Sequence, residues 1–314
     1  MNCACCMSNW QKGIRLQSDD SLPMDIQSPA KINLYLEVTG KRPDGYHDLN
    51  TLMCCIDLHD SIRLSLKKTG ITIHCSHPDV PQDETNLACR AAKLFFDTIG
   101  SRDGVHMDIE KRIPIGAGLG GGSSNAAGVL KALNAHYGAP VSQTDLLLMG
   151  KTIGADVPFF IYGKPAVATG IGDILTPCPY LESFPLVLIY PSVPVSTAEV
   201  YKKLNLRLTK NKKINTRFLF EQNRGRDAFQ FLFNDLEPVA SVICPGIAAA
   251  KASLLEHNAM AALMTGSGSA VFGLFENDDL ALKAFHAISG QITETTDNAY
   301  NKRTWQLHLS RLVV

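Results

Sequence analysis

The sequence has no excess charge of either sign: 30 Lys and Arg residues balance 30 Asp and Glu residues over 314 positions. A neutral chain has no general electrostatic attraction for nucleic acid or an anionic membrane, so we expect neither as a partner. It also lacks an apolar run long enough to span a membrane, because stretches such as Leu186 to Tyr190 have only the length of a strand. Any charged ligand must therefore be bound by local groups, and we expect a small-molecule partner.

Cysteine pairing and metal-ligand spacing are also lacking. The nine cysteines are an odd number in a chain too large to need disulfides, so we expect reduced thiols and a cytoplasmic protein. Cys3, Cys5 and Cys6 have no nearby histidine or second cysteine pair, which favours incidental thiols over a metal site. The histidines outside the motifs show no metal spacing either.

Residues 1–24 lack the apolar core of a secretory signal, and they carry Asp19 and Asp20, unlike a typical transit peptide. We expect a disordered extension, with a start codon at Met7 or Met24 as the other interpretation. At this length the remainder is predicted to form two lobes.

One segment, Pro114 to Gly128, is unusually rich in glycine: five of the seven residues 116–122 are glycine. Glycine costs about 0.5–1 kcal/mol in a regular element, so such a cluster indicates an unusual turn or a close approach of the backbone to another group. Small residues and then Val129, Leu130 and Leu133 follow at helical spacing. The loop therefore opens a helix, whose free N–H groups and dipole form an anion site suited to a phosphate chain.

Three interpretations of this loop compete. It is not a Walker loop, because no Gly-Lys-Ser/Thr closes it. Gly116, Gly118 and Gly121 fit a dinucleotide fingerprint and hence a dehydrogenase. That fold requires a second strand soon after the helix, but a helix stop at 134–140 and another helical pattern at 145–149 occupy that part of the sequence. A flexible linker is disfavoured because strand-like and helix-like sequence flank the loop.

Alternating residues from Ala30 to Val38 predict a half-buried strand, with Lys31 and Asn33 on its polar face about 7 Å apart. The signal Asp83 to Asn86 predicts the start of a helix over Leu87 to Ile99. We expect a basic surface connection between lobes at 205–226. The fold class is α+β. Further strands are expected at 62–66, 71–75, 105–109, 186–190, 270–275 and 305–313, and further helices at 247–256 and 281–288.

Three ordered segments resemble the motifs of the GHMP kinase superfamily: Pro29 to Leu34, the glycine loop from Pro114, and Met264 to Phe272. The resemblance runs from about Ser28 to beyond Gly273. Within the superfamily it is nearest to kinases of 4-diphosphocytidyl-2-C-methyl-D-erythritol, on the strength of the segments at 29–33, 44–47, 120–127 and 154–159.

This resemblance implies a two-lobed α+β fold, with an ATP-binding N-terminal lobe like ribosomal protein S5 domain 2 at 25–180 and a ferredoxin-like C-terminal lobe at 181–314. It implies ATP- and Mg²⁺-dependent phosphorylation of the 2-hydroxyl of that cytidyl diphosphate sugar alcohol, in non-mevalonate isoprenoid synthesis, by a monomer or weak homodimer. A kinase for another alcohol, such as homoserine or mevalonate, and a nucleotide-binding sensor without catalysis are the alternatives.

The resemblance also implies site residues. Asp156 would accept the proton of the substrate hydroxyl. Lys31 would keep the Asp156 carboxylate ionised and would stabilise negative charge. The alternative role for Asp156 is a helix cap, and the alternative for Lys31 is an ordinary solvated surface lysine. Ser124 is a possible Mg²⁺ ligand. The nucleotide would be bound by Pro114, Ile115, Gly116, Ala117, Gly118, Leu119, Gly120, Gly121, Gly122, Ser123 and Ser124, with Asn86 and Lys111 lining the adenine pocket.

Substrate recognition is implied at Tyr46 and His47, where an aromatic face can stack on cytosine and a histidine can stack or bond to its edge. The alternative is an ordinary turn, because Asp44-Gly45 is a strong turn signal. By the same resemblance Asn33 contacts the substrate, with Tyr201 and Thr197 nearby.

Overall fold

The computed structural model describes residues 14–15, 23–204, 225–294 and 305–314. The chain packs into two units, one taken from residues up to 30, 59–113 and 120–164, the other from 31–58, 114–119 and 165–314. This division differs from the predicted contiguous lobes at 25–180 and 181–314. Two long neighbouring strands, β2 (Met24–Lys41) and β3 (His47–Lys67), cause the difference, because each contributes residues to both units.

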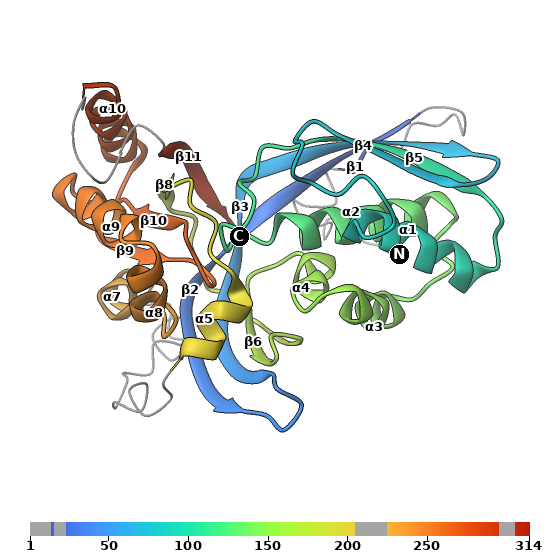
Figure 1. Cartoon of the computed structure of the whole chain (residues 1–314), viewed down its shortest axis with the longest axis horizontal. Helices are drawn as coiled ribbons and strands as arrows, with labels where there is room; N and C mark the ends of the chain where they lie inside the picture. The colour runs from blue at the N-terminus through green and yellow to red at the C-terminus, as the bar shows by residue number, and fades with distance from the viewer. Residues whose placement is uncertain (1–13, 16–22, 205–224, 295–304) are drawn as a thin grey trace, which may run out of the picture. The chain divides into compact units, whose positions relative to one another are not determined.

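The first unit contains the final part of β3 and the strands of the sheet that pair with it there (Figure 1). β5 (Gly104–Glu110) pairs antiparallel with β3, placing Ser61 opposite Glu110, and parallel with β4 (Ile71–Cys75). A two-residue strand, β1 (Ile14–Arg15), pairs with the start of β2. The predicted extension at 1–24 is therefore wrong for residues 14–15 and for Met24, which is buried in β2; its remainder, including the three clustered cysteines, lies outside the described residues.

Four helices accompany this sheet: α1 (Leu87–Ile99), α2 (Gly121–His136), α3 (Gln143–Ile153) and α4 (Val157–Tyr162). α1 has the predicted limits, because the Asn86 side chain accepts the Ala88 N–H at 2.9 Å and Gly100 ends the helix with φ 68°. α1 and α2 lie side by side (Figure 1). Their buried faces, with Phe95 and Leu130, form much of the apolar core of this unit.

The second unit is organised around β8 (Pro185–Tyr190), which is buried along its whole length. β8 pairs antiparallel with β10 (Val271–Leu274) and with β11 (Gln306–Val313), and β10 pairs with β9 (Ala261–Met264). β6 (Ala166–Gly170) joins β3 to β7 (Ile174–Pro177). The strands predicted at 186–190, 270–275 and 305–313 are thus confirmed.

Helices cover the β8–β10–β9 strands on one side (Figure 1). The helical elements of this unit are α5 (Thr197–Lys203), α7 (Gly225–Ala228), η2 (Phe229–Phe231), α8 (Glu237–Ile243), α9 (Gly246–Glu256) and α10 (Asp278–Glu294). Ala240 of α8, Leu254 of α9 and Ala281 of α10 belong to the same apolar core as Val187 and Ile189 of β8.

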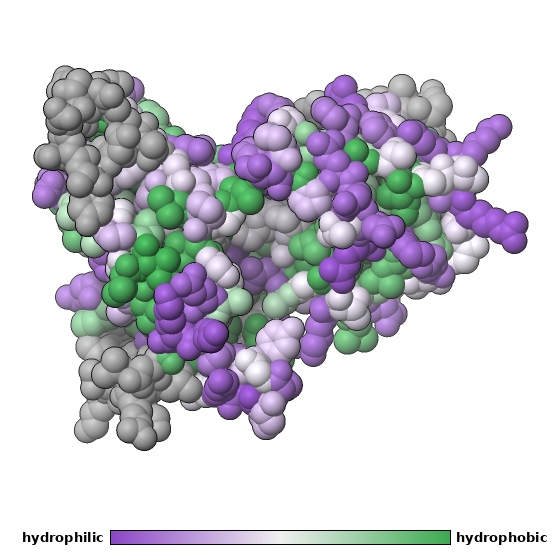
Figure 2. All heavy atoms as spheres, in the orientation of Figure 1, coloured by the Kyte–Doolittle hydropathy of each residue, from purple (hydrophilic) through white to green (hydrophobic). Residues whose placement is uncertain are grey.

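The connection predicted at 205–226 lies almost wholly outside the described residues. The helices on either side of it, α5 and α7, belong to the same unit, and its role as a connection between lobes stays a prediction. Among the described residues no single helix is both long and apolar enough to cross a membrane; only α8 and α9 taken together reach that length and composition, and they are bent by 115°. Apolar surface is visible around these two helices in Figure 2.

The strand predicted at 30–38 is present within β2, but the prediction that one of its faces is exposed is wrong. The side chains of Lys31, Asn33 and Tyr35 are only 4%, 3% and 1% exposed. Chain segments far away in the sequence cover this face, since Asn33 N donates to Thr265 Oγ1 and Leu36 N donates to the carbonyl oxygen of Phe233. Local alternation thus predicted the strand but not its neighbours.

Candidate active site

The glycine loop adopts backbone conformations that other residues rarely reach. Gly116, Gly118 and Gly120 have φ of 65°, 79° and 71°. A Cβ on Gly118 would lie 2.3 Å from the carbonyl oxygen of Thr265, so no side chain fits there. The predicted reason for the glycines, an unusual turn with a close backbone approach, is confirmed.

Backbone bonds anchor the first half of the loop, residues 114–119, within the second unit, and one of them runs from Val195 N to the Gly116 carbonyl oxygen at 3.4 Å. The carbonyl oxygen of Ala117 accepts the Ala270 N–H at 3.1 Å, and that of Leu119 accepts the Lys31 N–H at 3.0 Å. The first and third predicted motifs therefore both fix carbonyl groups of the loop, which leaves its N–H groups for other partners.

The second half of the loop begins α2 in the first unit, as predicted. Gly120 is the N-cap and offers no side-chain cap bond, while Ser124 N donates to the Gly120 carbonyl oxygen at 2.9 Å. The N–H groups of Gly121, Gly122 and Ser123 thus lie in the first turn of a 16-residue helix, where backbone donors have no partner further back along the helix. Such a start is a site for a phosphate group.

Asp156 lies in the same unit as this helix start. A Cβ on Gly154 would be 3.6 Å from Ser123 Oγ, so the segment that leads to Asp156 packs beside the first turn of α2. Asp156 is half-buried and directly precedes α4, but its side chain makes no cap bond to that helix. Asp156 thus occupies the N-cap position of α4 without a side-chain cap bond, and its role toward the substrate hydroxyl stays a prediction.

Lys111, which the resemblance implied for the adenine pocket, is engaged in a buried ion pair. Its Nζ donates to both oxygens of Asp60, at 3.1 and 2.8 Å, and to the carbonyl oxygen of Ile113 at 2.5 Å. Asp60 is fully buried and also accepts the backbone N–H groups of Arg112 and Ile113. The network holds the chain just before the glycine loop, and a Cβ on Gly121 would touch Lys111 Nζ at 3.0 Å.

The sequence analysis missed Asp60. The only local signal was a carboxylate inside a run of strand residues, and nothing in the sequence connected it to a lysine 51 positions away. Asn86, the other residue implied for adenine, caps α1 and donates from Nδ2 to the carbonyl oxygen of Pro81 at 2.7 Å. Adenine contacts of Asn86 and Lys111 stay predictions.

Lys31 is held in the second unit by a buried amide. Its Nζ donates to Asn33 Oδ1 at 2.7 Å, and the same oxygen accepts the Gly266 N–H at 3.0 Å. Asn33 Nδ2 donates to Thr51 Oγ1 at 2.9 Å. The burial of Lys31 contradicts the alternative of a solvated surface lysine. Asn33, implied as a substrate contact, orients Lys31 and the third motif, and its contact with a substrate stays a prediction.

Two predicted substrate residues that lie far apart in the chain come together. The rings of His47 and Tyr201 stack with centroids 4.9 Å apart and an interplanar angle of 27°. Partial burial, reinforced by the charge of Lys41, lowers the pKa of His47, which favours a neutral ring. Tyr46 is 59% exposed at the predicted turn, where Gly45 has φ 89°.

Thr197, the remaining predicted substrate residue, begins α5. Its Oγ1 lies 2.7 Å from Ser267 Oγ, so this hydroxyl is bonded to the third motif. Thr197 therefore connects the helix that carries Tyr201 with the Gly266–Gly268 turn.

Ser124 is the Mg²⁺ ligand that the resemblance implied, and the surroundings of its hydroxyl show whether it fits that role. Its Oγ is buried and has no hydrogen-bond partner among the described residues, which is unusual for a hydroxyl and fits a role toward a bound ion or phosphate. Within the part of the chain that the structure describes, no three His, Cys, Asp or Glu side chains could hold a metal ion. In nucleotide sites Mg²⁺ ordinarily takes phosphate oxygens and waters as most of its ligands, which is compatible with a single hydroxyl ligand from the chain.

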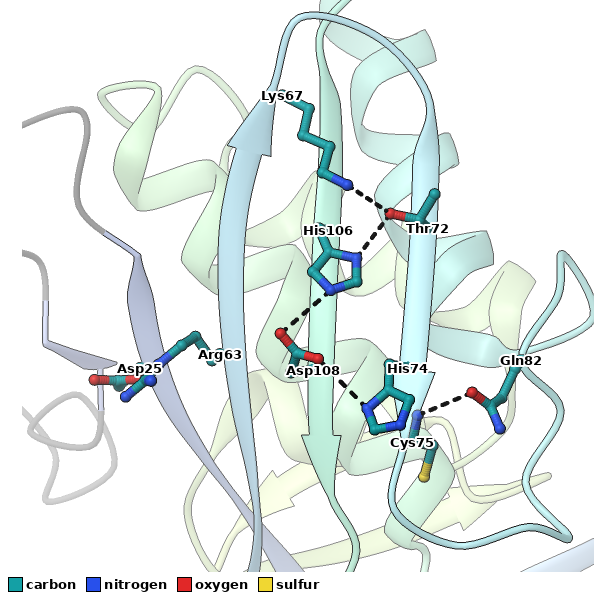
Figure 3. A network of polar contacts seen from close by, with 9 residues as sticks. All are labelled: Asp25, Arg63, Lys67, Thr72, His74, Cys75, Gln82, His106 and Asp108. Carbon is teal, nitrogen blue, oxygen red and sulfur yellow. Dashed lines mark hydrogen bonds and ion pairs between the residues drawn. The ribbon is translucent and has the colours of Figure 1, made fainter.

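A second polar cluster lies on the surface of the β4–β5 pair (Figure 3). Asp108 lies between two imidazoles, 3.5 Å from His74 Nδ1 and 3.2 Å from His106 Nε2, and His106 Nδ1 is 2.8 Å from Thr72 Oγ1. These groups are largely exposed, so their ion pairs contribute little to stability. The cluster belongs to the outer surface of the β4–β5 pair.

Comparison with known proteins agrees with this geometry. The model of the GHMP kinases N terminal domain matches residues 86–164, and that of the GHMP kinases C terminal domain matches 219–292. A 4-diphosphocytidyl-2-C-methyl-D-erythritol kinase of Desulfotalea psychrophila is 42% identical over 81% of this chain and 86% of its own length. The chain belongs to the GHMP kinase family. This kinase is also similar to the protein of the same description from Syntrophotalea carbinolica, at 45% identity over 84% of this chain and 94% of the relative.

Solved structures confirm the fold. A crystal structure of 4-(cytidine 5'-diphospho)-2C-methyl-D-erythritol kinase covers 93% of this kinase and 100% of its own chain, with 36% identity and a TM-score of 0.76. Homoserine kinase from Cytophaga hutchinsonii covers 96% of each chain with a TM-score of 0.70 but only 19% identity, which shows the fold alone. The predicted α+β GHMP kinase fold is confirmed, and the dehydrogenase alternative is wrong.

Proposed function

We propose that this kinase transfers a phosphoryl group from ATP to the 2-hydroxyl of 4-diphosphocytidyl-2-C-methyl-D-erythritol, giving the 2-phosphate and ADP in non-mevalonate isoprenoid precursor synthesis. The observation that carries the proposal is the stacked pair of His47 and Tyr201, which offers aromatic faces to a cytosine. Identities of 40–45% to relatives of this description, over most of each chain, support it.

We assign Asp156 as the group that accepts the proton of the substrate hydroxyl. Its carboxylate is half-buried, makes no cap bond and belongs to the unit that contains the α2 start. Lys31 stabilises negative charge on the transferred group, and its fixed position supports this role. Transfer is direct and in line, without a phosphoenzyme. Mg²⁺, when bound, neutralises charge on the phosphate oxygens, and Ser124 is the residue of this chain that fits it.

The N–H groups of Gly121, Gly122 and Ser123 bind the phosphate chain between Gly120 and Ser124, and the remaining loop residues, Pro114 to Leu119, shape the turn that leads to them. Asn33 and Thr197 orient neighbours of the substrate through the bonds described above. A monomer or weak homodimer and a cytoplasmic location stay predictions.

A coupled ADP-release assay tests the reaction. We expect turnover with the cytidyl alcohol and none with homoserine or mevalonate, and a loss of at least about 10²-fold in kcat for Asp156→Asn. Turnover of another alcohol with a higher kcat/KM would contradict the substrate, and an Asp156→Asn variant as active as the wild type would contradict the base.

The cytosine stack has its own test. Tyr201→Ala should raise KM for the cytidyl alcohol about 10-fold or more with little change in the ATP KM, since base–aromatic stacking contributes about 1–3 kcal/mol. Tyr180→Ala removes an exposed tyrosine of the same unit and is the control for the loss of a tyrosine ring, while Tyr201 itself is partly buried. Equal KM values in the two variants would contradict base stacking at Tyr201.

A further inference from the structure

A buried asparagine that the reaction does not yet use, Asn234, lies between β2 and the third motif. The backbone on both sides of it is fixed to one residue of β2: Leu36 N donates to the Phe233 carbonyl oxygen at 2.9 Å, and Asp235 N donates to the Leu36 carbonyl oxygen at 3.0 Å. Asn234 itself is 5% exposed. The Asn234 side chain therefore extends from backbone that is fixed to β2 within the second unit.

The Asn234 amide clamps the third motif. Its Nδ2 donates to the carbonyl oxygens of Met264 and Gly266, both at 2.8 Å, and its Oδ1 accepts the Leu236 N–H at 2.9 Å. Both hydrogens of the amide are thus used on the strand end that leads into the Gly266 turn. Water does not reach this side chain to replace them.

The opposite side of Gly266 faces Lys31. The Gly266 N–H donates to Asn33 Oδ1, the atom that also accepts Lys31 Nζ. A Cβ on Gly266 would lie 2.8 Å from the carbonyl oxygen of Gly118 and 3.2 Å from Lys31 Nζ. A continuous chain of bonds therefore leads from Asn234 through Gly266 and Asn33 to the Lys31 ammonium, all inside the second unit.

We propose that Asn234 is a positioning residue for phosphoryl transfer: through Gly266 it sets the place of the Lys31 ammonium and of the Gly118 turn. The inference rests on the proposed role of Lys31. Charge stabilisation in the transition state depends on placing the charged group to within a fraction of an ångström. A shift of Gly266 therefore lowers kcat rather than the affinity for substrate. Aspartate at 234 would have no hydrogen to donate and would turn a negative charge toward two carbonyl oxygens.

The test compares Asn234→Asp with Asn134→Asp. Asn134 is also buried, donates from Nδ2 to the Val141 carbonyl oxygen and accepts the Val141 N–H, but it closes a turn after α2 in the first unit. Both variants lose a buried amide donor, so both should unfold at a lower temperature. We expect kcat to fall about 10–10²-fold in Asn234→Asp alone, with KM for the alcohol within about threefold of wild type.

A double variant separates this inference from the proposed function. If Asn234 acts through Lys31, Asn234→Ala added to Lys31→Ala lowers kcat no further than Lys31→Ala does. If Lys31→Ala leaves kcat unchanged, the proposed role of Lys31 fails and the inference fails with it. If Lys31→Ala lowers kcat but the Asn234 effects multiply with it, or equal those of Asn134→Asp, the inference alone is overturned.

Should the Asn234 variants not fold, Gly266→Ala examines the next bond in the chain. Its Cβ would press on Lys31 Nζ and on the Gly118 carbonyl, so we expect the same loss of kcat and the same lack of additivity with Lys31→Ala. A fully active Gly266→Ala variant would overturn the inference.

Discussion

Replacing Lys111 by methionine examines the ion pair that precedes the glycine loop. Methionine keeps the length and apolar stem of lysine but removes the ammonium. In the structure that ammonium is the charged partner of the fully buried Asp60, with Nζ–Oδ distances of 2.8 and 3.1 Å. After the substitution Asp60 keeps two backbone donors, the N–H groups of Arg112 and Ile113 at 2.8 Å each. Its charge then has no counter-ion.

The expected effect is large because removing one partner of a buried ion pair costs about 3–5 kcal/mol. For folding units of this size each kcal/mol lowers Tm by about 2–4 °C, so Lys111→Met should lower Tm by about 6–20 °C. Thermal unfolding followed by circular dichroism measures this. The matched control is Lys93→Met, which breaks the exposed pair of Lys93 with Asp97 on α1. Exposed helix pairs contribute only about 0.3–0.5 kcal/mol, so this control should move Tm by no more than about 2 °C.

A second substitution distinguishes a lost charge partner from lost packing. Adding Asp60→Asn to Lys111→Met removes the unpaired charge, so the double variant should recover part of the lost Tm. A Tm for Lys111→Met within about 2 °C of wild type would refute the reasoning. If that variant instead raised the ATP KM at unchanged Tm, Lys111 would have the adenine role that the resemblance implied.

Two further predictions concern the loop and the sheet. Gly118→Ala should raise the ATP KM at least about 10-fold, because its Cβ would lie 2.3 Å from the Thr265 carbonyl oxygen at a φ of 79°. The control is Gly172→Ala, a glycine with φ 102° and open space around it. Equal ATP KM values in the two variants would contradict the prediction. Burial lowers the pKa of His308 below its ordinary 6.5, so the unfolded chain takes up this proton first as the pH falls, and the free energy of unfolding should decrease below pH 6.5. Urea unfolding at pH 7.5 and 5.5 should show a smaller decrease for His308→Leu than for the wild type, and equal decreases would exclude this contribution.

The elements that the sequence predicted well are those with strong local signals. Asn86 and Gly100 give α1 its limits, because a cap and a left-handed residue act within a few positions of the helix they bound. The glycine loop likewise predicted its own turn and the helix after it. The burial of Lys31 was not predictable from its neighbours, since the groups that cover it come from the third motif, more than two hundred residues later.

The candidate site divides in the same way. The sequence pattern pointed to His47 and Tyr201 only through a resemblance, and their stacking is a tertiary contact. Asp60 and Asn234 gave no pattern at all, because the role of each depends on partners brought to it by folding. A single polar residue inside an apolar run looks the same in a sequence whether it is solvated, capped or paired with a distant charge.

By itself the sequence determined the strands and helices that have strong local patterns, such as α1 and β8, together with the turn of the glycine loop, the balance of charge and the family. These follow from residue types and spacings over a few turns of chain, where backbone sterics and periodic burial act. Only the tertiary structure decided which polar groups are buried together, namely Lys111 with Asp60 and Lys31 with Asn33, Gly266 and Asn234. The physical reason is that a buried charge or amide must find its partners in space, and the distance along the chain does not limit that search.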